Sequence, residues 1–166
     1  MSPLQKIQSK QFDRDSLLEK VETWDAKGLK IVFTNGCFDI LHPGHIDYLA
    51  KAKSLGDKLI IGVNTDASVQ KLKGKNRPIQ NEKARLFLLG ALEFVDAVIL
   101  FGEDTPAQLI SQIMPHILVK GADYTIDKVV GAETVIPSGG SVVLLPYLQG
   151  FSTSGIEKKI LFSSVG

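Results

Sequence analysis

Several features that would narrow the class of protein are scarce in this sequence of 166 residues. Cys37 is its one cysteine, so no internal disulfide can form, and a reducing compartment is the simpler expectation. No run reaches the roughly 18 apolar residues of a membrane-spanning helix, and the N-terminus shows no apolar core of signal-peptide length. The net charge of +1 disfavours a protein that mainly neutralises a nucleic-acid backbone. We therefore expect a cytoplasmic globular protein that binds neither a membrane nor nucleic acid.

The positive charge is concentrated in one stretch, positions 71 to 85. Its single acid is Glu82, and its basic residues are Lys71, Lys73, Lys75, Arg77, Lys83 and Arg85. Such a stretch either binds a small anion or forms a solvated basic loop.

The apolar residues indicate an α/β fold. A first helix is expected from Ser16, with Glu19 completing a capping box, to Gly28. Five continuous runs rich in Val, Ile and Leu follow, a pattern typical of parallel strands covered on both faces. The runs are Lys30–Thr34, Lys58–Val63, Ala97–Phe101, Ile117–Lys120 and Val142–Leu145.

Helical patterns separate most of these runs. They begin at Pro43, at Asn81 and at Thr105, where Pro106 takes the first helical position. The order predicts a doubly wound, five-stranded parallel sheet preceded by an extra N-terminal helix. Ligands of such sheets bind beyond the carboxyl ends of the strands.

The segment TNGCFDILHPGH, Thr34 to His45, joins the first strand to the next helix. Gly36 and Gly44 remove side chains where a ligand would approach the backbone, and Pro43 fits the first turn of a helix. The helix N-terminus presents free amides to an anion.

His42 and His45 are about one helical turn apart, so both can donate hydrogen bonds to one phosphate, more strongly when protonated. Three other roles compete: a helix cap for His42, a surface position for His45, and metal ligation by both with Cys37. The metal site is disfavoured because a structural zinc ion normally needs four ligands. His116, the remaining histidine, starts a later strand at the other end of the sheet and cannot supply the fourth.

The GCFD and HPGH elements resemble the signature of the nucleotidyltransferase superfamily that includes the cytidylyltransferases and the nicotinamide-nucleotide adenylyltransferases. Further segments resemble one branch more closely, the heptose 1-phosphate adenylyltransferases, which often form the C-terminal half of a fusion with a sugar kinase. These segments are Val63–Ile79, Leu89–Val98, Phe101–Ile110, Leu118–Tyr124 and Gly150–Ile160.

The resemblance implies a Rossmann-like nucleotidyltransferase domain over residues 1–166, with residues 1–28 as an N-terminal extension and helix and residues 29–162 as the catalytic core. It implies transfer of AMP from ATP to heptose 1-phosphate, giving ADP-heptose and pyrophosphate for lipopolysaccharide core precursors. Mg²⁺ would be held mainly by the phosphates, with no metal site built from side chains alone. A separate sugar kinase would act upstream, and relatives suggest a homodimer.

The resemblance also implies residue roles. The catalytic residues would be His42, His45, Lys71 and Lys73. The nucleotide would be bound by Gly36, Cys37, Phe38, Asp39, Gly44, Arg85, Lys120, Gly121, Asp123, Ser152, Thr153 and Ser154. The sugar phosphate would be bound by Asp39, Asp66, Arg77 and Lys120.

Several of these residues have plainer alternatives. Arg85 fits a surface position on a helix, Asp66 a helix cap and Lys120 a solvated turn. The sequence also departs from the family where many relatives carry a basic residue after the Ser/Thr cluster. Glu157 stands there, and with Ser154 it makes an ordinary capping box.

Two other functions compete with the adenylyltransferase. One is a CTP-dependent cytidylyltransferase acting on a polyol or amino-alcohol phosphate. Tyr147 disfavours it slightly, since cytidylyltransferases tend to carry an arginine before the Ser/Thr cluster. The other is a nucleotide-binding sensor module without turnover. The presence of His42, Gly44, His45 and Lys73 together disfavours that module.

Overall fold

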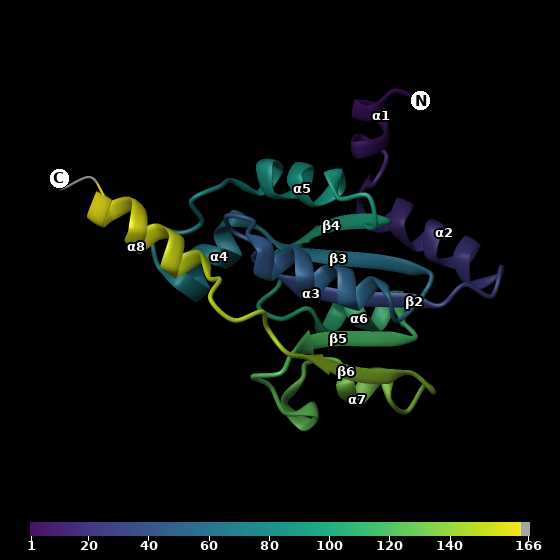
Figure 1. Ribbon diagram of the computed structural model, residues 1–166. Coiled ribbons are helices and arrows are strands. Elements are labelled where there is room, and N and C mark those ends of the chain that lie inside the picture. The colour runs from purple at the N-terminus through teal and green to yellow at the C-terminus, as the bar shows by residue number, and fades with distance from the viewer. Residues whose placement is uncertain (164–166) are drawn as a thin grey trace.

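The computed structural model describes residues 1–163, which form one parallel sheet with helices on both faces (Figure 1). The strand order is β1-β4-β3-β2-β5-β6, and every neighbouring pair is parallel. The strands are β1 (Gln11–Phe12), β2 (Ile31–Gly36), β3 (Lys58–Asn64), β4 (Ala97–Phe101), β5 (Ile117–Gly121) and β6 (Ser141–Leu145). The doubly wound α/β fold is therefore confirmed.

Neighbouring residues of each strand face opposite helical layers, which explains the continuous apolar runs. The helices are α1 (Pro3–Gln8), α2 (Arg14–Asp25), α3 (Pro43–Lys53), α4 (Asp66–Lys73), α5 (Glu82–Ala91), α6 (Ala107–Ile113), α7 (Ala132–Val135), α8 (Thr153–Ser163) and the 3₁₀ turn η1 (Ile126–Lys128). Phe33 of β2 packs in a core with α2, α6 and α7, whereas its neighbour Val32 packs in a second core with α3 and α5. The sheet is thus buried on both sides.

The prediction of five strands was wrong by one. Gln11 and Phe12 add a short edge strand, which pairs with Val98 and Ile99 of β4. A strand of two residues carries too little periodicity to be recognised in a sequence. The five predicted strands are present, with bounds that differ by two residues at most.

The start of the first long helix was also predicted wrongly. Helix α2 begins at Arg14 because the carboxylate of Asp13, three residues before Ser16, accepts the Ser16 amide at 2.9 Å and so caps the helix. The helix ends at Asp25, before Gly28. Leu17, Val21 and Trp24 form its buried apolar face. Helix α6 begins at Ala107, one residue later than predicted, with Pro106 at its N-cap.

Over the part of the chain that the structure describes, no helix is long and apolar enough to cross a membrane.

Candidate active site

A cleft of about 480 Å³ lies at the carboxyl edge of the sheet. Its floor is formed where four strands end, at Gly36 of β2, Asn64 of β3, Phe101 of β4 and Gly121 of β5. This is where parallel α/β sheets bind their ligands, as predicted.

The turn between β2 and α3 supplies one wall of the cleft. Phe38 and Ile40 adopt left-handed backbone conformations, with φ of 48° and 50°. Such conformations are costly for residues other than glycine and are retained where the surrounding structure fixes them. The turn leads to His42, which occupies the N-cap position of α3 but makes no side-chain capping bond. The capping role weighed for the His42 imidazole is therefore absent.

The two histidines of this turn stack on each other. Their ring centroids are 3.8 Å apart with planes inclined by 21°, and Phe38 meets the His45 ring edge-on at 5.5 Å. A β-carbon on Gly44 would lie 2.9 Å from the His42 ring and 3.3 Å from the β-carbon of Phe151. The absence of a side chain at Gly44 thus leaves space for the side chains of His42 and Phe151. The sequence had predicted that this space would admit a ligand.

Both imidazoles are held in the neutral form. Burial lowers the pKa of His42 below its ordinary value, and burial together with the nearby His42 and Lys73 lowers the pKa of His45 to about 4. The Nδ1 atoms of both rings are buried without a hydrogen-bond partner among residues 1–163. At neutral pH the pair therefore offers uncharged donors and acceptors, so the protonated donors considered from the sequence are absent from the free protein.

Asp39 is closed off by the loop before α5. Its carboxylate is 1% exposed and accepts the amides of Ile79 at 2.7 Å and Gln80 at 2.9 Å. Arg77 also donates to it at 3.3 Å. Asp39 borders the cleft, but its oxygens are already bonded to protein donors. The structure therefore gives Asp39 an anchoring role within the protein, and its predicted binding of the nucleotide and the sugar phosphate stays a prediction.

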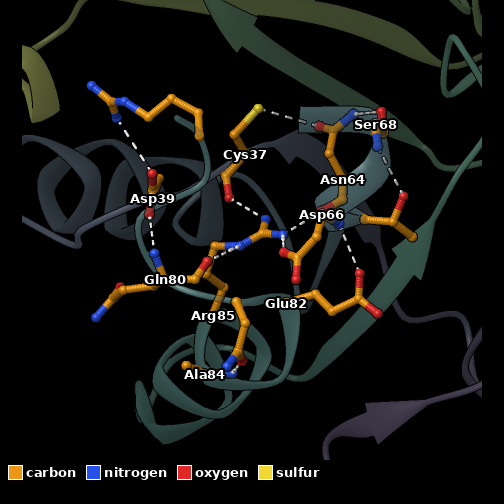
Figure 2. Close-up of polar contacts among 12 residues, drawn as sticks. Cys37, Asp39, Asn64, Asp66, Ser68, Gln80, Glu82, Ala84 and Arg85 are labelled. Atoms are coloured by element: carbon orange, nitrogen blue, oxygen red, sulfur yellow. Dashed lines mark hydrogen bonds and ion pairs between the residues drawn. The ribbon is translucent and has the colours of Figure 1, made fainter. Parts of the chain in front are cut away.

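Arg85 is fully buried at the centre of a polar network (Figure 2). Its guanidinium donates to the carbonyl oxygens of Gln80, Cys37 and Asn64 at 3.0, 2.6 and 2.8 Å. It also forms an ion pair with Asp66 at 2.8 Å. These bonds use its donors inside the protein, and neither Arg85 nor Asp66 lines the cleft. The surface position weighed for Arg85 is therefore wrong, whereas the ligand contacts predicted for Arg85 and Asp66 stay predictions.

The two lysines of α4 point to different surroundings. Lys73 lines the cleft, and the next residue, Gly74, turns the chain with a φ of 95°. Lys71 does not line the cleft and instead pairs with Asp104 at 3.4 Å, where both side chains are largely exposed. The structure thus brings one of the two predicted catalytic lysines to the site.

Lys120 supplies a second cation to the cleft. Its Nζ donates to the carbonyl of Asn35 at 3.3 Å and lies 5.8 Å from the Tyr124 ring centroid. Burial lowers its pKa to about 8. Next to it, a β-carbon on Gly121 would collide with the Tyr147 ring, so Tyr147 lies directly over Gly121. Burial raises the pKa of Tyr147 to about 12.

The start of α8 closes the cleft on a further side. Thr153 lines it and donates from Oγ1 to the Asp39 carbonyl at 2.7 Å. Ser152 caps the helix by accepting the Gly155 amide at 3.0 Å. The capping box of Ser154 and Glu157 was wrong, because Glu157 pairs with Arg77 at 2.5 Å.

Not every predicted ligand contact reaches the cleft. Gly36, Cys37, Phe38, Asp39, Lys120, Gly121 and Thr153 line it, whereas Gly44, Asp123, Ser152, Ser154 and Arg77 do not. Burial raises the pKa of the Cys37 thiol, so the thiol is protonated in the free protein. Among residues 1–163, no cluster of three His, Cys, Asp or Glu side chains could hold a metal ion.

Sequence reasoning missed several polar residues of the cleft, namely Asn35, Tyr48, Asn64, Asp104, Thr105 and Tyr124. Asn35 and Asn64 stand at the ends of β2 and β3, and a polar residue there is the signal that would have found them. Tyr48 lies on the apolar face of α3. It packs there, yet its ring also lines the cleft, and its hydroxyl shares a 2.9 Å hydrogen bond with Thr34.

Comparison with known families assigns this site to a class. The cytidylyltransferase-like family model matches residues 33–156, which include the histidine turn, the Lys73 segment and the start of α8. The chain belongs to this family of nucleotidyltransferase enzymes.

Individual relatives narrow the comparison. The chain is 53% identical over 145 residues to a bifunctional protein HldE of Nitrobacter hamburgensis and 56% identical over 142 residues to that of Paramagnetospirillum magneticum. These matches cover 87% and 86% of this chain but 30% and 29% of the relatives, so the chain spans under a third of their length.

Two solved structures share the fold. A lipopolysaccharide core biosynthesis protein of Thermoplasma volcanium is 35% identical with a TM-score of 0.59, and the match covers 73% of this chain and 98% of that one. A pantoate-beta-alanine ligase of Francisella tularensis is 16% identical with a TM-score of 0.59, and the match covers 89% of this chain and 75% of the ligase chain. The second match is evidence for the fold alone.

The burial of Arg85 leads to a stability prediction. Arg85→Met removes the donor shared by three carbonyls and the Asp66 carboxylate, so it should lower the free energy of unfolding by about 3–5 kcal/mol. Urea unfolding measures this, with Lys83→Met on the exposed side of α5 as the matched control. Unchanged stability combined with weaker nucleotide binding would instead assign Arg85 to the ligand.

The low pKa of His45 leads to a pH prediction. As the pH falls through about 6.5, the unfolded chain binds a proton that the folded protein accepts only near its own pKa of about 4. The free energy of unfolding should therefore decrease between these two pH values. Urea unfolding at several pH values tests this, and His45→Gln should flatten the dependence. An equal slope in both proteins would contradict the assignment.

Proposed function

We propose that this chain transfers AMP from ATP to heptose 1-phosphate, forming ADP-heptose and pyrophosphate. The observation that carries the proposal is the grouping of His45, Lys73, Lys120 and Thr153 around one cleft at the carboxyl edge of the sheet, with His42 stacked on His45. The 53–56% identity to proteins named HldE and the 35% identity to a lipopolysaccharide core biosynthesis protein support the sugar phosphate as acceptor.

The groups of the cleft suit a reaction limited by positioning and by charge. An oxygen of the sugar phosphate, already ionised near neutral pH, attacks the α-phosphorus of ATP, and the bond from that phosphorus to the bridging oxygen of pyrophosphate breaks. No strong general base is required. Lys73 and the histidine pair stabilise the negative charge that develops on the phosphoryl oxygens, and Thr153 binds the departing pyrophosphate.

Mg²⁺ would enter with the triphosphate, held mainly by phosphate oxygens. A sugar kinase reaction has to supply the heptose 1-phosphate. We place the enzyme in the cytoplasm, where ATP is available, and propose a homodimer by analogy with the family.

A cytidylyltransferase is the second candidate, favoured by the family that matches residues 33–156. Pyrophosphate release should be measured with ATP and with CTP, each combined with heptose 1-phosphate and with glycerol 3-phosphate. We expect release with ATP and heptose 1-phosphate and only background release when the sugar phosphate is omitted. Faster release with CTP and glycerol 3-phosphate would establish the second candidate. ATP binding without product in any combination would identify a sensor module.

A histidine substitution tests the mechanism. His45→Ala removes a donor near the transferred phosphorus, so the turnover number should fall by about 10²-fold or more. His116→Ala, at the opposite end of the sheet, serves as the control. A His45→Ala enzyme that retains nearly full turnover would remove His45 from the mechanism.

A further inference from the structure

Arg77 joins two segments that are far apart in the sequence. Its Nη1 lies 3.3 Å from Asp39 in the β2–α3 turn, and its Nη2 lies 2.5 Å from Glu157 in the second turn of α8. The Arg77 side chain is 12% exposed. A planar guanidinium suits such a bridge because its two ends can each donate to a different carboxylate.

This bridge keeps Arg77 away from the ligand. Asp39 is 1% exposed and is held in place by the amides of Ile79 and Gln80. Turning the guanidinium toward the cleft would leave a buried carboxylate without its cationic partner, which is costly. Arg77 is also absent from the cleft lining. The contacts therefore favour a bridging role for Arg77 within the protein over the predicted role of substrate ligand.

The bridge matters because α8 is weakly held by apolar packing. Helix α8 extends away from the sheet (Figure 1), and none of its residues is buried. Two polar contacts hold its first two turns. One is the bond from Thr153 to the Asp39 carbonyl of the β2–α3 turn. The other is the pair of Glu157 with Arg77 of the loop before α5, and Arg77 in turn contacts Asp39.

Both segments contribute to the cleft, and so does the segment just before Arg77. Thr153 belongs to α8, His45 follows Asp39, and Lys73 lies four residues before Arg77. We propose that Arg77 is a positioning residue that acts through Glu157 and Asp39 to hold Thr153 and Lys73 at the nucleotide's phosphates. The identity of the ligand rests on the proposed function, whereas the bridge itself does not.

Glu157→Gln is the sharpest test because it removes one charge at a position 36% exposed and leaves Asp39 and Arg77 paired. The KM for ATP should rise about threefold to fivefold, the range expected for a partly exposed ion pair. The turnover number and the KM for the sugar phosphate should change less than twofold, since an interaction made equally in the ground and transition states alters KM alone. Amide exchange at Gly155 and Ile156 should quicken.

Arg77→Lys supplies the second variant. Lysine keeps the positive charge but places its donors on a single nitrogen and lacks the planar fork that spans the two carboxylates, so the KM for ATP should rise without loss of folding. Combined with Glu157→Gln, its effect should be less than the product of the single effects, because both changes break the same bridge. Arg14→Gln is the control and should leave KM unchanged, since it breaks the 2.7 Å pair of Arg14, at the start of α2, with Glu103, in the loop after β4.

Two results would overturn the proposal. One is a Glu157→Gln protein with the wild-type KM for ATP and unchanged amide exchange in α8. The other is an equal loss in all kinetic parameters together with lower global stability, which indicates a merely structural role. If the wild-type protein transfers no AMP, the dissociation constant for ATP, measured by calorimetry, replaces KM. That result separates a failure of the proposed reaction from a failure of the bridge.

Discussion

The site depends on one buried cation. The guanidinium of Arg85 collects the carbonyls of Cys37, Asn64 and Gln80, which come from the end of β2, the end of β3 and the loop before α5. Unpaired, these converging oxygens would be costly to bury. Their satisfaction by a single rigid group fixes the relative positions of three chain segments, and two of these segments form the floor and one wall of the cleft.

The internal use of arginine changes the electrostatics inferred from the sequence. Positions 71 to 85 carry a marked basic excess, yet Arg85 and Arg77 bind protein oxygens and Lys71 pairs with Asp104. From this stretch Lys73 reaches the cleft, where Lys120 of β5 joins it. The attraction for a polyanion therefore comes from few, well-placed lysines. This division of roles follows from the chemistry of the two side chains. The planar guanidinium of arginine suits fixed bridges, whereas the ammonium of lysine is a movable point charge.

The sequence predicted most of the fold and the location of the cleft. Strand runs such as Ala97–Phe101 are buried on both faces, so their composition reflects the final structure. Roles of single polar residues were harder to predict, since Asp39, Asp66 and Arg85 have the same composition signal whether they bind a ligand or each other. Only the three-dimensional contacts distinguish these cases. Asp13 and the two residues of β1 were missed because each signal is local and short.

The stacked histidines show why the cleft is built around neutral rings. At a centroid distance of 3.8 Å, two imidazolium ions would repel each other strongly, and burial adds to the cost of charging either ring. The free protein therefore holds both imidazoles uncharged. An uncharged pair attracts no counter-anion, so its N–H groups can donate to a ligand without an anion first having to leave. Under the proposed function, a triphosphate in the cleft would shift this balance, because its negative charge favours protonation of the rings it contacts.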